Sequence, residues 1–177
     1  MRSTFIVAVV SALIVGGSLV RGTLQAQTGS AATTAARLQA LEDREAIRAL
    51  MNDYGRTLDS RDFVAFGRLW ARDSEFVGGG GNSAKGPAAI QALLEKLLKM
   101  NGAPVPGRDF HLVFNQTIDV SGDSATGLSK GGWMVRKPEN RLDMQILADY
   151  FDQFVREDGR WKFKRRQIGG DPPAGSR

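Results

Sequence analysis

Three polar side chains occupy positions where the surrounding pattern is apolar: Tyr54, Asp59 and His111. His111 is the only histidine of the chain and lies within the extended apolar run FHLVFN at 110–115. A buried polar group costs free energy unless it is paired, so a carboxylate and an imidazole that face one interior should meet. A carboxylate also fixes the tautomer of an imidazole and prepares it for proton transfer near neutral pH. These residues therefore predict acid–base chemistry, in which Asp59 orients His111 and His111 moves the proton.

Each of these residues also has a purely structural interpretation. Asp59 or Ser60 stands before a short helix and could cap its first backbone N–H groups. His111 could be a satisfied core residue or could face solvent, because the apolar residues beside it occupy the alternate face of the strand. Tyr54 has the helical spacing of a core residue, and on a straight helix it is rotated by about 140° from Asp59. The side chains converge only if the chain bends at Asp59.

The first half of the chain has the apolar spacing of helices. Apolar residues recur every three or four positions over 37–58 and again over 63–70, with a polar corner between them. A third helix is predicted from Pro87, a residue suited to the first helical position, and its leucines form one stripe. Residues 74–77 predict a short strand, which leads into a flexible loop, GGGG, at 78–81.

The second half of the chain has the spacing of strands. From Phe110 the apolar period falls to two, which predicts antiparallel strands separated by turns at SGDS, PENR and DG. Helices followed by a strand meander predict an α+β domain, with three helices packed against one face of a curved, mostly antiparallel sheet.

The N-terminus has the pattern of a secretory signal peptide over residues 1–26: Arg2, an apolar run from Phe5 to Val20, and the small residue Ala26. The run is shorter than the roughly 20 residues of a membrane-spanning helix. We therefore expect cleavage near Ala26, export to the periplasm or the medium, and no stable membrane insertion afterwards; an uncleaved anchor is the alternative. A flexible linker over 27–36, one domain over 37–169 and a disordered tail over 170–177 complete the predicted organisation.

The residue counts argue against several kinds of site. With one histidine and no cysteine among 177 residues, a metal site is not expected and no disulfide can form. In GGGGNSAKG the lysine precedes glycine, so the segment is not a Walker-type phosphate loop. The basic run KFKRR has inward-facing neighbours on a predicted strand and fits a solvated face better than a nucleic-acid surface. We expect neither a cofactor nor a nucleic-acid partner.

The elements and their order resemble the SnoaL-like domains of the nuclear transport factor 2 superfamily over residues 37–168. The resemblance is carried by ALEDREAIRALMNDYGRTLDSRDFVAFGRLWARDSEF, KGPAAIQALL, FHLVFNQTIDVSGDSATG and ADYFDQFVREDGRWKFKRRQI. It implies a cone-shaped fold with a deep apolar pocket, and a homodimer formed through the sheet. It also implies cofactor-free acid–base chemistry on small hydrophobic ring compounds, as in scytalone dehydratase, bile-acid dehydratase and ketosteroid isomerase. Many other members only bind or scaffold.

The resemblance assigns the catalytic aspartate to Asp59, the catalytic histidine to His111 and a tyrosine that polarises a substrate oxygen to Tyr54. The second histidine of scytalone dehydratase has no counterpart in this chain. An arginine on the last strand of some relatives matches Arg165. Residue type and expected facing add Asn115 as a polar contact, and the following residues as apolar pocket walls: Phe63, Trp70, Leu94, Leu98, Phe114 and Trp133.

Three functions remain open at this point. The chain could be an exported lyase (a dehydratase) or isomerase that acts on a small hydrophobic cyclic substrate. It could instead be a non-catalytic module that binds a small molecule in the same pocket, or an interaction domain that uses the sheet face. Catalysis requires Asp59 and His111 within hydrogen-bond reach and open to the cavity, whereas a binding module tolerates them apart.

Overall fold

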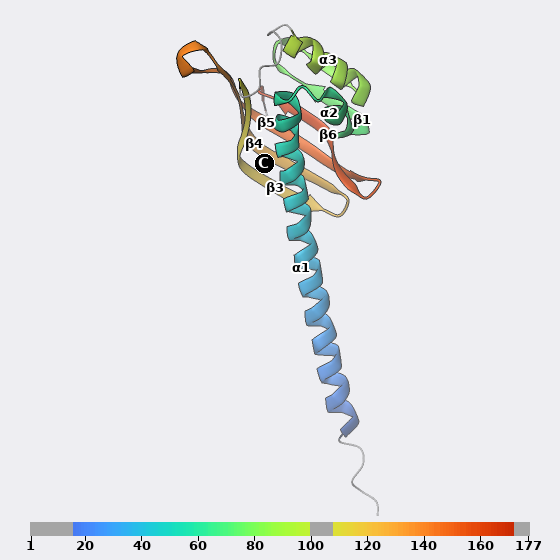
Figure 1. The fold of residues 1–177 in the computed structure, drawn as a ribbon. Helices are drawn as coiled ribbons and strands as arrows, with labels where there is room; N and C mark the ends of the chain where they lie inside the picture. The colour runs from blue at the N-terminus through green and yellow to red at the C-terminus, as the bar shows by residue number, and fades with distance from the viewer. Residues whose placement is uncertain (1–15, 100–107, 172–177) are drawn as a thin grey trace, which may run out of the picture. The chain divides into compact units, whose positions relative to one another are not determined.

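The chain divides into two units, Met1–Leu41 and Glu42–Arg177, in a computed structural model that describes residues 16–99 and 108–171. Helix α1, Gly16–Asp59, passes through this boundary (Figure 1). Residues 27–36, predicted to be a linker, are helical, which agrees with the high helix propensity of their alanines and the absence of proline. The predicted signal peptide and tail lie partly outside the described residues. Within the described part, no helix is both long and apolar enough to span a bilayer.

Three helical segments belong to the second unit. They are the last part of α1, which ends at Asp59 as the apolar period predicts, the short helix α2, Phe63–Arg68, and α3, Pro87–Lys99. The predicted leucine stripe of α3 faces the core, where its most buried residues are Ile90, Leu94 and Leu98.

Asp62 caps helix α2. Its carboxylate accepts a hydrogen bond from the backbone N–H of Ala65 at 2.9 Å. The prediction that Asp59 or Ser60 fills this role is therefore wrong. The chain turns through Arg61, at a φ of 59°, so Asp62 and not Asp59 or Ser60 directly precedes α2. The carboxylate of Asp59 is left for another partner.

The strands form one six-stranded sheet in the order β2-β1-β6-β5-β4-β3, and β1 and β2 lie between α2 and α3 along the chain. Neighbouring strands are antiparallel except β1 and β6, which are parallel. The strands of the second half and their turns confirm the predicted meander, and β1 begins at Trp70, which was predicted to be helical. The short strand β2 was not predicted. The strands are β1 Trp70–Val77, β2 Ser83–Lys85, β3 Asp109–Ser121, β4 Ser124–Arg136, β5 Leu142–Glu157 and β6 Arg160–Ile168.

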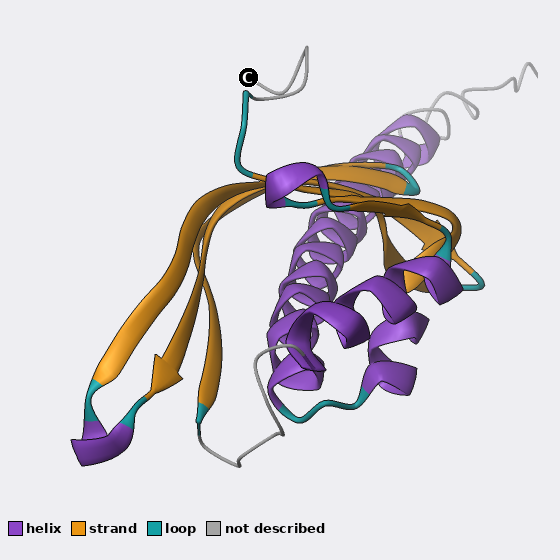
Figure 2. Ribbon diagram, turned by 90° about the horizontal axis from the view of Figure 1, so that it is seen from above, coloured by secondary structure: helices purple, strands orange, loops and turns teal. Residues whose placement is uncertain are grey.

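The sheet is curved and unclosed, and α2, α3 and the end of α1 lie against its concave side (Figure 2). The predicted α+β class is confirmed. The predicted GGGG loop between β1 and β2 contains a short 3-10 turn, Gly79–Gly81, in which Gly80 and Gly81 have φ of 66° and 80°. Only glycine adopts such angles without steric cost, so the sequence permits this tight connection.

Strand β3 contains a β-bulge at Asn115. Phe114 pairs with Lys130 and Thr117 pairs with Leu128, so two residues of β3 stand opposite one residue of β4. Asn115 has a φ of 53°, a conformation that asparagine tolerates better than most residues. The extra residue exchanges the two faces of the strand. Odd-numbered residues face the helices before the bulge, and even-numbered residues do so after it.

A second bulge lies in β6 at Lys164. Phe163 pairs with Phe154, but Arg165 pairs with the preceding residue of β5, Gln153. The side chain that follows Phe163 into the interior is consequently Arg166, which is 0% exposed, rather than Arg165. The bulge therefore decides which of two adjacent arginines enters the core.

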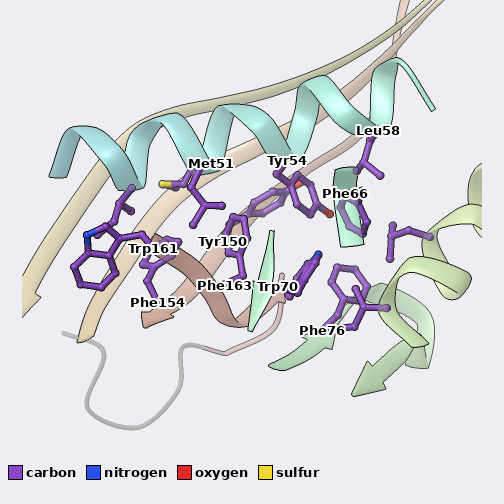
Figure 3. Close-up of a cluster of buried hydrophobic side chains, with 14 of the residues drawn as sticks. Met51, Tyr54, Leu58, Phe66, Trp70, Phe76, Tyr150, Phe154, Trp161 and Phe163 are labelled. Atoms are coloured by element: carbon purple, nitrogen blue, oxygen red, sulfur yellow. The ribbon is translucent and has the colours of Figure 1, made fainter. Parts of the chain in front are cut away.

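Aromatic side chains dominate the core between the helices and the sheet (Figure 3). Tyr54 of α1 lies within 5.4–6.5 Å, centroid to centroid, of the rings of Phe66, Trp70, Tyr150 and Phe163. Most of these pairs are edge-to-face, a geometry that the ring quadrupole favours. Burial of large rings supplies much of the hydrophobic stabilisation, at about 25 cal/mol per Å² of apolar area.

Candidate active site

Asp59 and His111 form a hydrogen-bonded pair at the end of α1. His111 Nδ1 lies 2.5 Å from Asp59 Oδ1, and the backbone N–H of His111 donates to both carboxylate oxygens at 3.1 and 3.0 Å. The side chains are 27% exposed for Asp59 and 10% for His111. Because Nδ1 donates to the carboxylate, Nε2 is the nitrogen that can accept a proton from a ligand.

The sheet topology explains why the carboxylate is needed there. β3 is an edge strand, so one row of its backbone N–H groups has no neighbouring strand to pair with. Asp59 satisfies one of these groups and fixes the imidazole of the same residue. The last turn of α1 approaches β3 closely because Gly55, which has no side chain, faces His111. The helix corner and the strand edge together set the geometry of the pair.

His111 lines a cavity of about 480 Å³ between the helices and the sheet. Its wall is mainly apolar, with contributions from α1, the β1–β2 connection, α3 and the sheet. The lining residues are Tyr54, Phe76, Gly78, Gly79, Asn82, Leu94, Leu97, Leu98, His111, Trp133, Ile146, Tyr150 and Ile168. An apolar cavity with a few convergent polar groups is the usual form of a small-molecule site. The predicted apolar pocket is therefore present.

Trp133 of β4 stacks on the imidazole of His111. Their ring centroids are 5.9 Å apart and the planes differ by 11°. The two residues are directly paired across β3 and β4, so the ladder itself brings the rings into register. Asp59 holds one edge of the imidazole and Trp133 covers one face, which leaves the ring little freedom to rotate.

Tyr54 and Tyr150 supply two phenols to the cavity wall. Burial raises the pKa of the Tyr54 phenol far above its ordinary value, and the nearby Tyr150 adds to this effect. Burial likewise raises the pKa of Tyr150. Both phenols therefore remain protonated at neutral pH and can donate hydrogen bonds to a ligand. The Tyr54 ring lies 6.5 Å from that of His111, at an interplanar angle of 83°.

The structure brings together five of the residues predicted from the sequence around this cavity: Tyr54, Leu94, Leu98, His111 and Trp133. Asp59 stands behind His111 and contacts the ligand space only through it. Two predicted pocket walls belong to the core instead: Trp70 is 1% exposed, and Phe63 packs partly buried against the same cluster. Their rings support the wall rather than line it.

Three predicted substrate contacts are wrong. Phe114 is 39% exposed and Asn115 is also exposed, because the strand bulges at this point and Phe114 points away from the helices. Arg165 pairs with Glu75 at 3.1 Å and does not line the cavity. The bulges account for these positions: Asn115 is itself the bulged residue of β3, Phe114 lies on the face opposite His111, and the bulge at Lys164 places Arg166 rather than Arg165 inside.

Sequence reasoning missed Tyr150, Arg166 and the β1–β2 connection. Tyr150 falls in a strand whose alternation gave no sign of a cavity, although the chain has only two tyrosines and both reach this site. Arg166 is fully buried and its guanidinium lies 4.1 Å from the centroid of the Tyr54 ring. Gly78 and Gly79 belong to the predicted glycine loop and Asn82 follows it, but the sequence of a loop does not reveal which element the loop approaches.

No group of three or more histidine, cysteine, aspartate or glutamate side chains that could hold a metal occurs in the described part of the chain. The lining residues with polar side-chain groups are His111, Tyr54, Tyr150, Trp133 and Asn82. This set can move one proton and donate several neutral hydrogen bonds.

The fold and the site define a class of protein: a small α+β domain in which helices close a curved sheet over an apolar cavity containing a carboxylate–imidazole pair. The chain belongs to the SnoaL-like domain family, whose model matches residues 39–167. This match confirms the resemblance noted in the sequence and places the domain in the nuclear transport factor 2 superfamily.

Several known proteins are similar to this chain. Gamma-hexachlorocyclohexane dehydrochlorinase of Sphingobium indicum is 28% identical over 130 residues, which are 73% of this chain and 81% of that protein. A crystal structure of an NTF2-like protein with a cystatin-like fold from Novosphingobium aromaticivorans is 32% identical, with a TM-score of 0.66, and the match covers 81% of this chain and 92% of that one. Hexachlorocyclohexane dehydrochlorinase LinA-type3 of Novosphingobium barchaimii is 26% identical, with a TM-score of 0.63 and coverage of 78% and 95%. The family and its relatives support a fold of the small-molecule dehydratase and isomerase type.

Proposed function

We propose that the protein is a cofactor-independent lyase or isomerase that removes a proton from a small hydrophobic cyclic substrate. One observation carries the proposal: His111 lines the cavity while its Nδ1 lies 2.5 Å from Asp59 Oδ1. A module that only binds a ligand has no need for an oriented base at its cavity wall. The cavity of about 480 Å³ fits a compound with one or two rings.

The proposed reaction is a 1,2-elimination, or an isomerisation that begins with the same step. Nε2 of His111 takes a proton from a substrate carbon, and the electron pair of that C–H bond forms the new double bond. The bond from the adjacent carbon to the leaving group breaks, and the leaving group departs with its electron pair. Asp59 stabilises the imidazolium that forms, and imidazolium can return the proton to a leaving hydroxyl, which departs as water.

Tyr54 supplies the complementary acid in this scheme. A neutral phenol donates a hydrogen bond to a substrate oxygen or to the departing group, where negative charge develops. The dehydrochlorinase activity named for two similar proteins is also an elimination, in which chloride rather than water would leave. We therefore favour elimination over isomerisation as the reaction class.

The test is a screen of cyclic alcohols, hydroxyketones and halides, with loss of water or hydrogen halide followed by mass spectrometry. Each hit is repeated with His111→Ala, which should lower turnover by about 10²- to 10⁴-fold while circular dichroism shows an intact fold. Undiminished turnover by a folded His111→Ala variant would remove this mechanism and leave a binding module as the better description.

A second activity, association with another copy of the chain, is favoured by the outer face of the sheet. Four residues on this face are large, apolar and exposed by 39–62%: Leu112, Phe114, Leu128 and Leu147. Leu112 and Leu147 both flank Gly132 in the strand ladder, and Phe114 follows Leu112 on the same face of β3, so these three residues are neighbours. Exposed apolar patches of this kind mark interaction sites. We propose a homodimer through this face; a monomer in analytical ultracentrifugation at micromolar concentration would contradict it.

We also propose that the protein is exported and cleaved near Ala26. The support is the sequence pattern of residues 1–26, part of which lies outside the described residues. Expression of the full chain in a bacterial host with a functional secretion system tests this point. Recovery of a periplasmic product that lacks the first 26 residues, by intact mass, is the expected result; an uncut chain in the membrane fraction would indicate an anchor instead.

A further inference from the structure

Both tyrosines of the chain lie against one buried guanidinium. Arg166 Cζ lies 4.1 Å from the ring centroid of Tyr54 and 4.8 Å from that of Tyr150. A third ring, Phe163, lies 4.3 Å from the same atom. A guanidinium is planar and is attracted to the faces of aromatic rings, so its position constrains the rings that surround it. The two phenols that line the cavity thus share one support.

Asp152 fixes the guanidinium in turn. Nε and Nη2 of Arg166 donate to Oδ1 and Oδ2 of Asp152 at 2.8 and 2.7 Å, a bidentate arrangement that sets the plane of the guanidinium. Both side chains are 0% exposed. A fully buried ion pair contributes little net stability compared with apolar residues of similar volume, because desolvation offsets the attraction. Stability alone is therefore a poor explanation for a charged pair at the centre of an aromatic core.

We propose that the Arg166–Asp152 pair is a positioning device that holds Tyr54 and Tyr150, the two neutral hydrogen-bond donors of the cavity. The role of the phenols in this proposal rests on the proposed function. Arg166 and Asp152 are not among the lining residues, so they act through the two rings and not on the ligand. The pair adds no net charge behind the cavity, which favours an uncharged substrate over an anionic one.

The charges around the phenols agree with this role. The titratable groups that surround Tyr54 are Tyr150, Arg166 and Asp152, and the imidazole of His111 lies 6.5 Å away. The guanidinium alone lowers the pKa of both phenols, and Asp152 opposes it. The carboxylate therefore has two effects: it orients Arg166, and it opposes the lowering of the pKa of the two phenols by the cation.

The first experiment needs no substrate. Because the chain contains only two tyrosines, the ultraviolet absorbance of tyrosinate during a pH titration reports on Tyr54 and Tyr150 alone. In Asp152→Asn the cation is no longer balanced, and we expect the phenols to ionise at a lower pH than in the parent protein. A folded Asp152→Asn variant with an unchanged titration curve would overturn the proposal. The control is the double variant Lys164→Gln with Asp73→Asn, which removes an ion pair at the surface. It should leave the tyrosinate titration curve unchanged.

A second variant covers the case in which Asp152→Asn does not fold. Arg166→Met combined with Asp152→Leu removes the pair without leaving a buried charge, an exchange that cores tolerate well. In protein with ¹³C-labelled tyrosine we expect the two ring signals to shift and broaden, since the rings lose their support.

With an elimination substrate in hand, kcat of the same double variant should fall about tenfold to a hundredfold while KM changes less. Unchanged ring signals would overturn the proposal, and so would an unchanged kcat. Failure of the proposed function would give a different result. The parent and His111→Ala would then have equal turnover, while the tyrosine ring signals would still change when the Arg166–Asp152 pair is removed.

Discussion

Gly55 of α1 lies directly against His111 of β3. A Cβ atom added to Gly55 would stand 3.0 Å from His111 Cβ and 3.1 Å from the carbonyl oxygen of the same residue. The absence of a side chain at this position allows the helix corner to approach the strand edge, and this approach brings Asp59 within hydrogen-bond reach of the imidazole. The glycine is thus part of the geometry of the site although it has no chemistry of its own.

Gly55→Ala should reduce turnover more than stability. Alanine is favoured over glycine inside a helix by about 1 kcal/mol, and this gain opposes the cost of moving α1 away from β3. We expect a change of less than about 1 kcal/mol in the free energy of unfolding, but a fall of about tenfold to a hundredfold in kcat, because small displacements of catalytic groups are costly. Denaturant titration and steady-state kinetics measure the two effects. The control is Asn52→Ala on the exposed side of the helix, which should leave kcat unchanged.

Asp59→Asn should remove activity while the domain remains folded. An amide at this position can present its oxygen or its NH₂ group to the imidazole, so the tautomer and the stabilisation of imidazolium are no longer secured. We expect kcat to fall by about 10²- to 10⁴-fold with a smaller change in KM. Asp62→Asn is the matched control, because asparagine also caps helices well and Asp62 caps α2. If both variants retained full turnover, Asp59 would have no part in proton transfer.

Alkaline pH should destabilise the folded domain through its two tyrosines. Burial raises the pKa of Tyr54 and Tyr150 in the folded state, whereas in the unfolded chain they ionise near their ordinary value of about 10. The unfolded state therefore binds fewer protons above that pH, and stability is complete below about pH 10 and declines as pH rises further. Urea unfolding followed at a series of pH values measures this decline. Tyr54→Phe should make the decline shallower, and a slope equal to that of the parent would show that Tyr54 does not contribute.

Gly131→Ala should disturb the cavity from the sheet side. A Cβ atom at Gly131 would overlap the ring of Tyr150, which packs over this glycine on the neighbouring strand. We expect Tyr150 to be displaced toward the cavity, with a loss of about 1–3 kcal/mol in the free energy of unfolding and weaker ligand binding. Gly132→Ala is the control, since its nearest neighbours would lie at 3.6 Å, an ordinary contact distance. Thermal unfolding and the binding of a hydrophobic dye displaced by substrate measure both effects; equal behaviour of the two variants would contradict the packing described.

The sequence by itself determined most of the helices and strands and the candidate residues for acid–base chemistry. The helical periods of 37–58 and 87–99 and the alternation after Phe110 are local patterns. Such patterns predict helices and strands directly, because each kind of secondary structure has its own side-chain period. Asp59, His111 and Tyr54 were predictable as candidates because a polar side chain in an apolar pattern requires a partner. The sequence also favoured the family, through the order of its elements.

Only the tertiary structure decided which side chains share the cavity. The bulges at Asn115 and Lys164 shift the facing of β3 and β6 by one residue, which turned Phe114 outward and brought Arg166 inward in place of Arg165. A bulge arises from the pairing of a strand with its neighbour and leaves no reliable mark in the strand's own sequence. The role of Asp59 was likewise decided by tertiary structure. Its carboxylate could accept hydrogen bonds either from the first N–H groups of α2 or from His111, and the approach of α1 to the edge of β3 selects His111.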